Sequence, residues 1–166
     1  MVTTERNPVD LGHRLVSLHE VITKLRRECP WDRVQTHATL APYALDEASE
    51  LAEALQAAEE ALSGDTDESA TAIEDLVEEL GDVLLQVLMN AAIGEQAGTF
   101  TLAEVLETVE AKMLRRHPHV FERDPDAPEP TDAELSVQWE AIKAAEREAR
   151  AQRIAAREAR TSVLSC

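Results

Sequence analysis

The spacing of apolar side chains along the chain predicts a succession of amphipathic helices. Between Pro8 and Glu28, leucine and isoleucine recur in alternate steps of four and three residues, which is the period of one helical face. Pro30 then ends this helix, because proline disfavours helical backbone at the residue before it. The same spacing predicts a second helix from about Thr39 to Leu62, with a stripe made of Ala44, Ala48, Leu51, Leu55, Ala58 and Leu62.

Three further helices are predicted from their starting sequences. A threonine followed three residues later by glutamate is typical of a helix start, and it occurs at Thr71, Thr101 and Thr131. The third helix extends to the glycines at 94 and 98, and the absence of charge from 83 to 93 predicts burial on most sides of that half. Gly81 interrupts this helix, and we interpret it as the sign of a close contact.

The fourth helix is expected to end at His117, where a proline follows, and the fifth to run towards Arg160 after a proline-rich loop at 122–130. No segment has the alternation of a strand. The composition agrees, because alanine, the best helix former, supplies 26 residues, whereas only 5 residues are aromatic. The sequence therefore predicts one all-α domain, an antiparallel bundle of four to five helices.

The net charge of −17 changes the picture of possible partners. Such acidity disfavours nucleic acid as a partner, because proteins that bind it concentrate positive charge. No apolar run is long enough to span a membrane, and residues 1–10 lack the pattern of a signal peptide. Two cysteines are too few for a disulfide framework. We therefore expect a cytoplasmic protein that binds neither nucleic acid nor a membrane.

The negative charge is concentrated in one stretch. Residues 41–110 contain 18 acidic residues and no lysine or arginine. Within this stretch, Glu47 and Glu50 on the second helix are repeated 32 residues later as Glu79 and Asp82 on the third. Two carboxylates three residues apart project about 60° from one another, so each pair lies on one side of its helix, at the border of the apolar stripe.

Antiparallel packing of these two helices would bring the four carboxylates together. Such a cluster is costly without a counter-charge, and a divalent cation supplies one. Oxygen-only donors favour Mg²⁺, with Mn²⁺ as an alternative. A competing interpretation is a solvated acidic face, since single Glu-x-x-Glu pairs are common. A di-iron site of the ferritin type fits poorly, because it needs Glu-x-x-His pairs and no histidine lies between His37 and His117.

The chain becomes basic downstream of this stretch. Lys112 and Arg116 are four residues apart and hence on one helical face, where they could bind phosphate oxygens. The alternative is that they simply stabilise the C-terminus of their helix, where cations are favourable.

Five motifs, in this order, resemble those of MazG-type nucleoside triphosphate pyrophosphohydrolases. They cover about residues 11–146 and comprise CPWD with QTH at 29–37, DEASE at 46–50, EELGD at 78–82, KMLRRHPHVF at 112–121 and WEAIK at 139–143. The resemblance implies a catalytic domain at 11–146, between an N-terminal arm at 1–10 and a charged helical tail at 147–166. It also implies a homodimer or a dimer of dimers that completes the bundle.

The resemblance further implies Mg²⁺-dependent cleavage of NTPs or dNTPs to the monophosphate and pyrophosphate, in nucleotide-pool house-cleaning. Its motifs make Glu47, Glu50, Glu79 and Asp82 the metal ligands. Nucleotide contacts are then expected from Trp31, Tyr43, Lys112, Arg116 and Trp139, of which the tryptophans could equally be core residues. Proton acceptors for the attacking water would be Asp46, Glu53 or Glu78.

One departure from the family pattern argues against Asp46 as the proton acceptor. The family often has two consecutive glutamates where this chain has Asp46 and Glu47, and aspartate is the shorter side chain. A nucleotide-sensing protein that binds without cleavage, or a non-catalytic helical assembly module, remains the alternative function.

Overall fold

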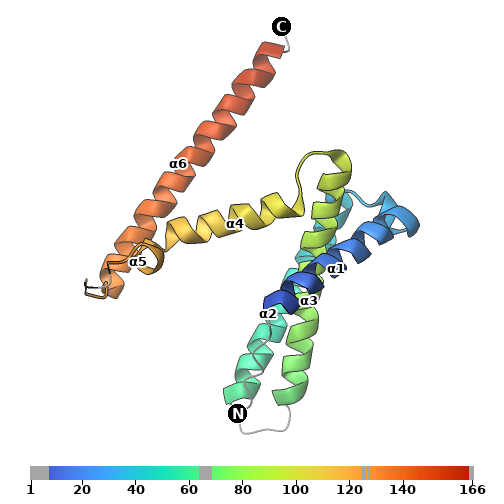
Figure 1. Cartoon of the computed structure of the whole chain (residues 1–166), viewed down its shortest axis with the longest axis horizontal. Helices are drawn as coiled ribbons and strands as arrows, with labels where there is room; N and C mark the ends of the chain where they lie inside the picture. The colour runs from blue at the N-terminus through green and yellow to red at the C-terminus, as the bar shows by residue number, and fades with distance from the viewer. Residues whose placement is uncertain (1–7, 64–68, 125, 127, 165–166) are drawn as a thin grey trace. The chain divides into compact units, whose positions relative to one another are not determined.

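The five predicted helices form, together with two short ones that the sequence does not predict, and the computed structural model describes residues 8–63, 69–124, 126 and 128–164. They are α1 (Pro8–Glu28), the short 3-10 helix η1 (Asp32–Val34), α2 (His37–Ser63), α3 (Ser69–Ala97), α4 (Leu102–Arg116), α5 (Pro118–Phe121) and α6 (Asp132–Leu164) (Figure 1). No strand occurs in these ranges, so the predicted all-α class is confirmed. The predicted loop at 64–68 and most of the N-terminal arm lie outside the described residues.

The chain divides into two compact units, Met1–Leu106 and Glu107–Cys166. The first contains α1, α2, α3 and the start of α4, and the second contains the rest of α4 with α5 and α6. Helix α6 is continuous through residue 146, where the boundary between catalytic domain and tail is predicted. None of the described helices is long and apolar enough to cross a lipid bilayer.

Local hydrogen bonds explain where the helices begin. Thr101 and Thr131 each exchange bonds with the glutamate three residues later, which completes two of the three predicted capping boxes. Helix α2 begins two residues earlier than predicted because Thr36 accepts a bond from the backbone N–H of Thr39, at 3.2 Å. Thr71 is not a cap, since α3 already includes Ser69.

Gly98 ends α3 as predicted, with a φ of 63°, a backbone conformation that glycine adopts without strain. Two glycines within α3 differ from the expectation. Gly81 has nothing within 4 Å of the place where a Cβ would lie, so the close contact expected there is absent from the described part of the chain. The close contact is at Gly94 instead, against the ring of Phe100.

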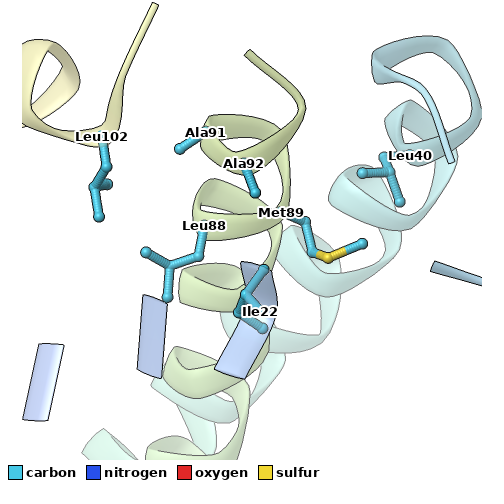
Figure 2. Close-up of a cluster of buried hydrophobic side chains, with 7 residues drawn as sticks. All are labelled: Ile22, Leu40, Leu88, Met89, Ala91, Ala92 and Leu102. Carbon is cyan, nitrogen blue, oxygen red and sulfur yellow. The ribbon is translucent and has the colours of Figure 1, made fainter. Parts of the chain in front are cut away.

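The core of the first unit lies where α1 and α2 pack against the C-terminal half of α3 (Figure 2). Helices α2 and α3 run side by side in opposite directions (Figure 1), as expected for an antiparallel bundle. Burial of the uncharged half of α3 is less complete than predicted, because Leu84, Leu85 and Val87 stay more than a third exposed where no described element covers them. The fully or nearly buried side chains are Ile22, Leu40, Leu88, Met89, Ala91, Ala92 and Leu102.

A buried arginine ties the loop after α1 to the end of α3. Arg26 is only 7% exposed, and its guanidinium donates to the carbonyls of Asp32 and Gln35 and to the side chain of Gln96. These bonds fix the loop that contains Trp31. No pattern in the sequence distinguishes Arg26, because its helix carries several other cations.

Candidate metal centre

Helices α2 and α3 bring together three of the four predicted metal ligands. Glu47, Glu50 and Glu79 each offer a carboxylate oxygen, and these oxygens lie within 4.8 Å of one another. Glu47 belongs to the least exposed line of α2, which follows positions 40, 44, 47, 51, 54, 58 and 61. Glu79 belongs to the matching line of α3 at 69, 72, 76, 79, 83, 86 and 90. Two acidic side chains thus occupy positions that face the partner helix.

The packing of these acids shifts their proton affinities. Burial raises the pKa of Glu79, and repulsion from the Glu50, Asp82 and Glu47 carboxylates raises it further. Burial likewise raises the pKa of Glu47, with repulsion from Asp82 and Glu50 adding to the effect and a hydrogen bond from Gln86 opposing it. The cluster is therefore electrostatically unfavourable for its own carboxylates, which a cation would relieve.

The donor set fits a hard divalent ion. Glu79 Oε2 is buried and has no hydrogen-bond partner in the described structure, which is unusual for a carboxylate oxygen. All three clustered donors are carboxylate oxygens, the type that Mg²⁺ prefers. Asp82 lies outside the tight group of three but close enough to act on the pKa of both Glu47 and Glu79.

The candidate proton acceptors flank the cluster. Asp46 and Glu78 immediately precede Glu47 and Glu79, and both are exposed. The charge of Asp46 acts on the pKa of Glu47, and that of Glu78 on the pKa of Glu79. Glu53 is also exposed, one turn beyond Glu50 on α2.

Two predicted nucleotide contacts in the first unit pair with one another. The rings of Trp31 and Tyr43 meet edge to face with centroids 5.9 Å apart, and both residues remain about half exposed. Neither is a core residue, so the alternative interpretation of Trp31 as core filler is wrong. Exposed aromatic rings of this kind offer a surface on which another ring can stack.

The other three predicted contacts belong to the second unit. Arg116 lies over the ring of Trp139, 5.0 Å from its centroid, and is held by Glu146, which also binds Arg115. These bonds keep the pKa of Glu146 at about 2 and raise that of Arg116. Lys112, one turn earlier on α4, is half-buried. Glu146 is not predictable from the sequence pattern, since it stands in a helix full of glutamates.

Comparison with known proteins agrees with the geometry of this site. A sequence profile of the MazG nucleotide pyrophosphohydrolase domain matches residues 35–121, which contain all the clustered carboxylates. The chain belongs to the MazG family. The matched region runs from just before α2 to the end of α5.

Two of three similar proteins are named as nucleoside triphosphate pyrophosphohydrolases. A nucleoside triphosphate pyrophosphohydrolase/pyrophosphatase MazG from Thermotoga maritima is 40% identical over 82% of this chain and 46% of its own length. A nucleoside triphosphate pyrophosphohydrolase from Escherichia coli K12 is 35% identical over 84% of this chain and 47% of its own. An uncharacterized protein, YabN from Bacillus subtilis, is 42% identical over 82% of this chain and 25% of its own. The chain thus spans between a quarter and about half of these relatives.

Proposed function

We propose that the protein hydrolyses ribo- or deoxyribonucleoside triphosphates to the monophosphate and pyrophosphate, with Mg²⁺ as cofactor and Mn²⁺ as an alternative. The observation that carries this proposal is the meeting of Glu47, Glu50 and Glu79, with one buried carboxylate oxygen left without a partner in the described structure. Membership of the MazG family and the names of the relatives support the choice of substrate. Such an activity would serve nucleotide-pool house-cleaning.

Glu47, Glu50, Glu79 and Asp82 are the proposed ligands of the metal. A bound divalent ion supplies charge neutralisation for the triphosphate and lowers the pKa of a water molecule. One exposed neighbouring carboxylate, Asp46, Glu53 or Glu78, would take the proton from the water that attacks the α-phosphorus. The exposure of all three leaves them able to exchange that proton with solvent.

The basic and aromatic residues have proposed roles in binding. Lys112 and Arg116 would neutralise phosphate oxygens, for which a guanidinium and an ammonium are the usual donors. Trp31, Tyr43 and Trp139 would contact the nucleotide through their rings. Glu146 and Trp139 orient the guanidinium of Arg116, which would prepare it for binding phosphate.

We further propose a cytoplasmic homodimer or dimer of dimers that binds neither nucleic acid nor a membrane. Support for self-association comes from exposed apolar side chains on α3, where Val77, Leu80 and Leu84 share one helical face and are 63%, 49% and 40% exposed. Exposed apolar residues arranged along a face indicate an interface. Replacing Leu80 with glutamate is expected to lower the mass measured by light scattering during gel filtration.

The proposed reaction is tested by product analysis. The protein is incubated with each NTP and dNTP and Mg²⁺, and pyrophosphate and monophosphate are quantified with and without EDTA. Equal amounts of both products, abolished by EDTA and by Glu79→Gln, are expected. Glu74→Gln is the matched control, because Glu74 is an exposed glutamate on the same helix outside the cluster. Binding without products would favour a sensor, and neither binding nor products a helical assembly module.

A further inference from the structure

The carboxylate of Glu146 on α6 holds the two arginines at the end of α4. Arg116 donates to it through Nε, which lies 3.2 Å from each carboxylate oxygen, and through Nη2. Arg115 donates to Oε1 through its own Nη2. The side chains of Arg116 and Glu146 are only 18% and 22% exposed, so this pair is largely shielded from solvent. We call these three residues the Arg115–Arg116–Glu146 trio.

Glu146 occupies one edge of the Arg116 guanidinium and leaves another edge available. A guanidinium carries five N–H groups in a planar fork. Nε and Nη2 point to Glu146, whereas no described residue accepts a hydrogen bond from Nη1. The ring of Trp139 lies against the guanidinium, with 5.0 Å between Cζ and the ring centroid. The edge formed by Nη1 and Nη2 therefore remains, and an edge of this kind can bind two oxygens of a phosphate.

A carboxylate beside a phosphate-binding arginine needs a counter-charge of its own. Glu146 alone would cancel the charge of Arg116 and repel a phosphate. Arg115 binds the same carboxylate, so two guanidiniums face one carboxylate and the trio has a net charge of +1. The trio can thus hold Arg116 in place and still attract an anion.

We propose that Glu146 is a positioning residue that acts through Arg116, presenting the Nη1–Nη2 edge to the phosphates of the substrate while Arg115 offsets its charge. The proposal rests on the proposed function, in which Arg116 binds phosphate. A long side chain that is ordered before binding loses less conformational entropy when the ligand arrives, and the planar fork of arginine keeps its direction. Glu146 therefore strengthens phosphate binding without touching the substrate.

Positioning and simple competition predict opposite effects of Glu146→Gln. If Glu146 only competed with phosphate for Arg116, glutamine would release the guanidinium and raise the net charge of the trio to +2, so an anion would bind more tightly. If Glu146 positions Arg116, the variant binds an anion more weakly even though its charge has become more favourable.

Pyrophosphate, the inorganic product of the proposed reaction, is the probe because it contains neither base nor sugar. Its binding to the whole protein in Mg²⁺ buffer is measured by isothermal titration calorimetry. Glu146→Gln is expected to weaken binding by at least about tenfold. Glu148→Gln is the matched control with unchanged affinity, because Glu148 is an exposed glutamate on the same helix that bonds to Gln152. Circular dichroism verifies that both variants are folded at the assay temperature.

A double-mutant cycle shows whether Glu146 acts through Arg116. Arg116→Ala should itself weaken pyrophosphate binding. Adding Glu146→Gln to it should weaken binding further by less than about twofold, because the group that Glu146 positions is gone. General damage to the second unit would instead give a loss that adds to that of Arg116→Ala, and this result would overturn the proposal.

The metal site provides a further control. Glu146→Gln should bind Mn²⁺ as tightly as the wild type, since Glu146 belongs to the second unit and the carboxylate cluster to the first. A matching loss of Mn²⁺ affinity would show that the variant disturbs more than Arg116, and it would overturn the positioning role.

The outcomes separate this proposal from the proposed function. Unchanged or tighter pyrophosphate binding by Glu146→Gln would overturn the positioning role, even where the wild type releases pyrophosphate from NTPs and so supports the proposed function. A wild type whose pyrophosphate binding is weakened by Glu146→Gln only when Arg116 is present, yet which releases no pyrophosphate from NTPs, would support the positioning role and refute the proposed activity.

Discussion

Two glycines of the same helix predict different effects of the same substitution. At Gly94 a Cβ atom would lie 2.7 Å from two carbons of the Phe100 ring and 2.9 Å from a third. At Gly81 it would meet nothing within 4 Å. Both positions are inside α3, so alanine brings the same gain in helix propensity at each, about 1 kcal/mol.

The difference in unfolding free energy between the two variants therefore measures the effect of the contact with Phe100 alone. Inserting a methyl group into a packed site typically costs about 1–3 kcal/mol. Gly81→Ala is expected to stabilise the protein by about 1 kcal/mol. Gly94→Ala is expected to be less stable than Gly81→Ala by about 1–3 kcal/mol, because the Phe100 ring must move.

Urea unfolding followed by circular dichroism measures the two free energies. Equal stability of Gly94→Ala and Gly81→Ala would refute the reasoning, because it would mean that the Phe100 ring does not occupy the space beside Gly94.

The remaining predictions concern the charged and hydrogen-bonded groups. In EDTA, Glu79→Gln should melt at a higher temperature than the wild type. The reason is that the pKa of Glu79 is raised in the folded protein, so its ionised form destabilises the fold at neutral pH. A lower melting temperature for the variant would contradict this prediction. Arg26→Leu should lower the free energy of unfolding by about 2–4 kcal/mol, because it leaves Gln96 and two backbone carbonyls without their donor. Urea unfolding measures this loss, with replacement of the exposed Arg14 as the control. Equal losses for the two arginines would refute the role of Arg26 in holding the loop. Glu146→Gln should destabilise the second unit at neutral pH. Because the pKa of Glu146 falls from 4.5 to about 2 on folding, the difference in melting temperature between variant and wild type should shrink as the pH falls through that interval. A difference that does not depend on pH would show that the ion pairs of Glu146 contribute nothing to stability.

The helices and their caps could be predicted from the sequence because the signals are local. Apolar spacing and the threonine–glutamate pairs at 101 and 131 depend on residues within one or two turns. The facing side of α2 was less predictable. The predicted stripe included Leu55 and Leu62, which are 50% and 64% exposed, whereas the least exposed line of the helix passes through Glu47. Apolar periodicity misses that line, since one of its central members is an acid.

The site was predictable in part for the same reason. The repeated pairs of carboxylates on two helices are visible in the sequence alone, and they indicate Glu47, Glu50 and Glu79. Gln86, whose side chain hydrogen-bonds to Glu47, has no such signal, because a single amide in a helix can have many roles. Glu146 requires knowledge of how α4 and α6 pack, which is a contact across 30 residues of sequence.

Direct measurement of metal binding tests the central claim most closely. Mn²⁺ is titrated into the protein and the free ion is followed by electron paramagnetic resonance, with Glu79→Gln and Glu74→Gln compared with the wild type. The carboxylate cluster predicts saturable binding that EDTA reverses, weakened at least about tenfold by Glu79→Gln and unchanged by Glu74→Gln. Equal affinity of the wild type and Glu79→Gln would contradict the assignment of this cluster as the metal site.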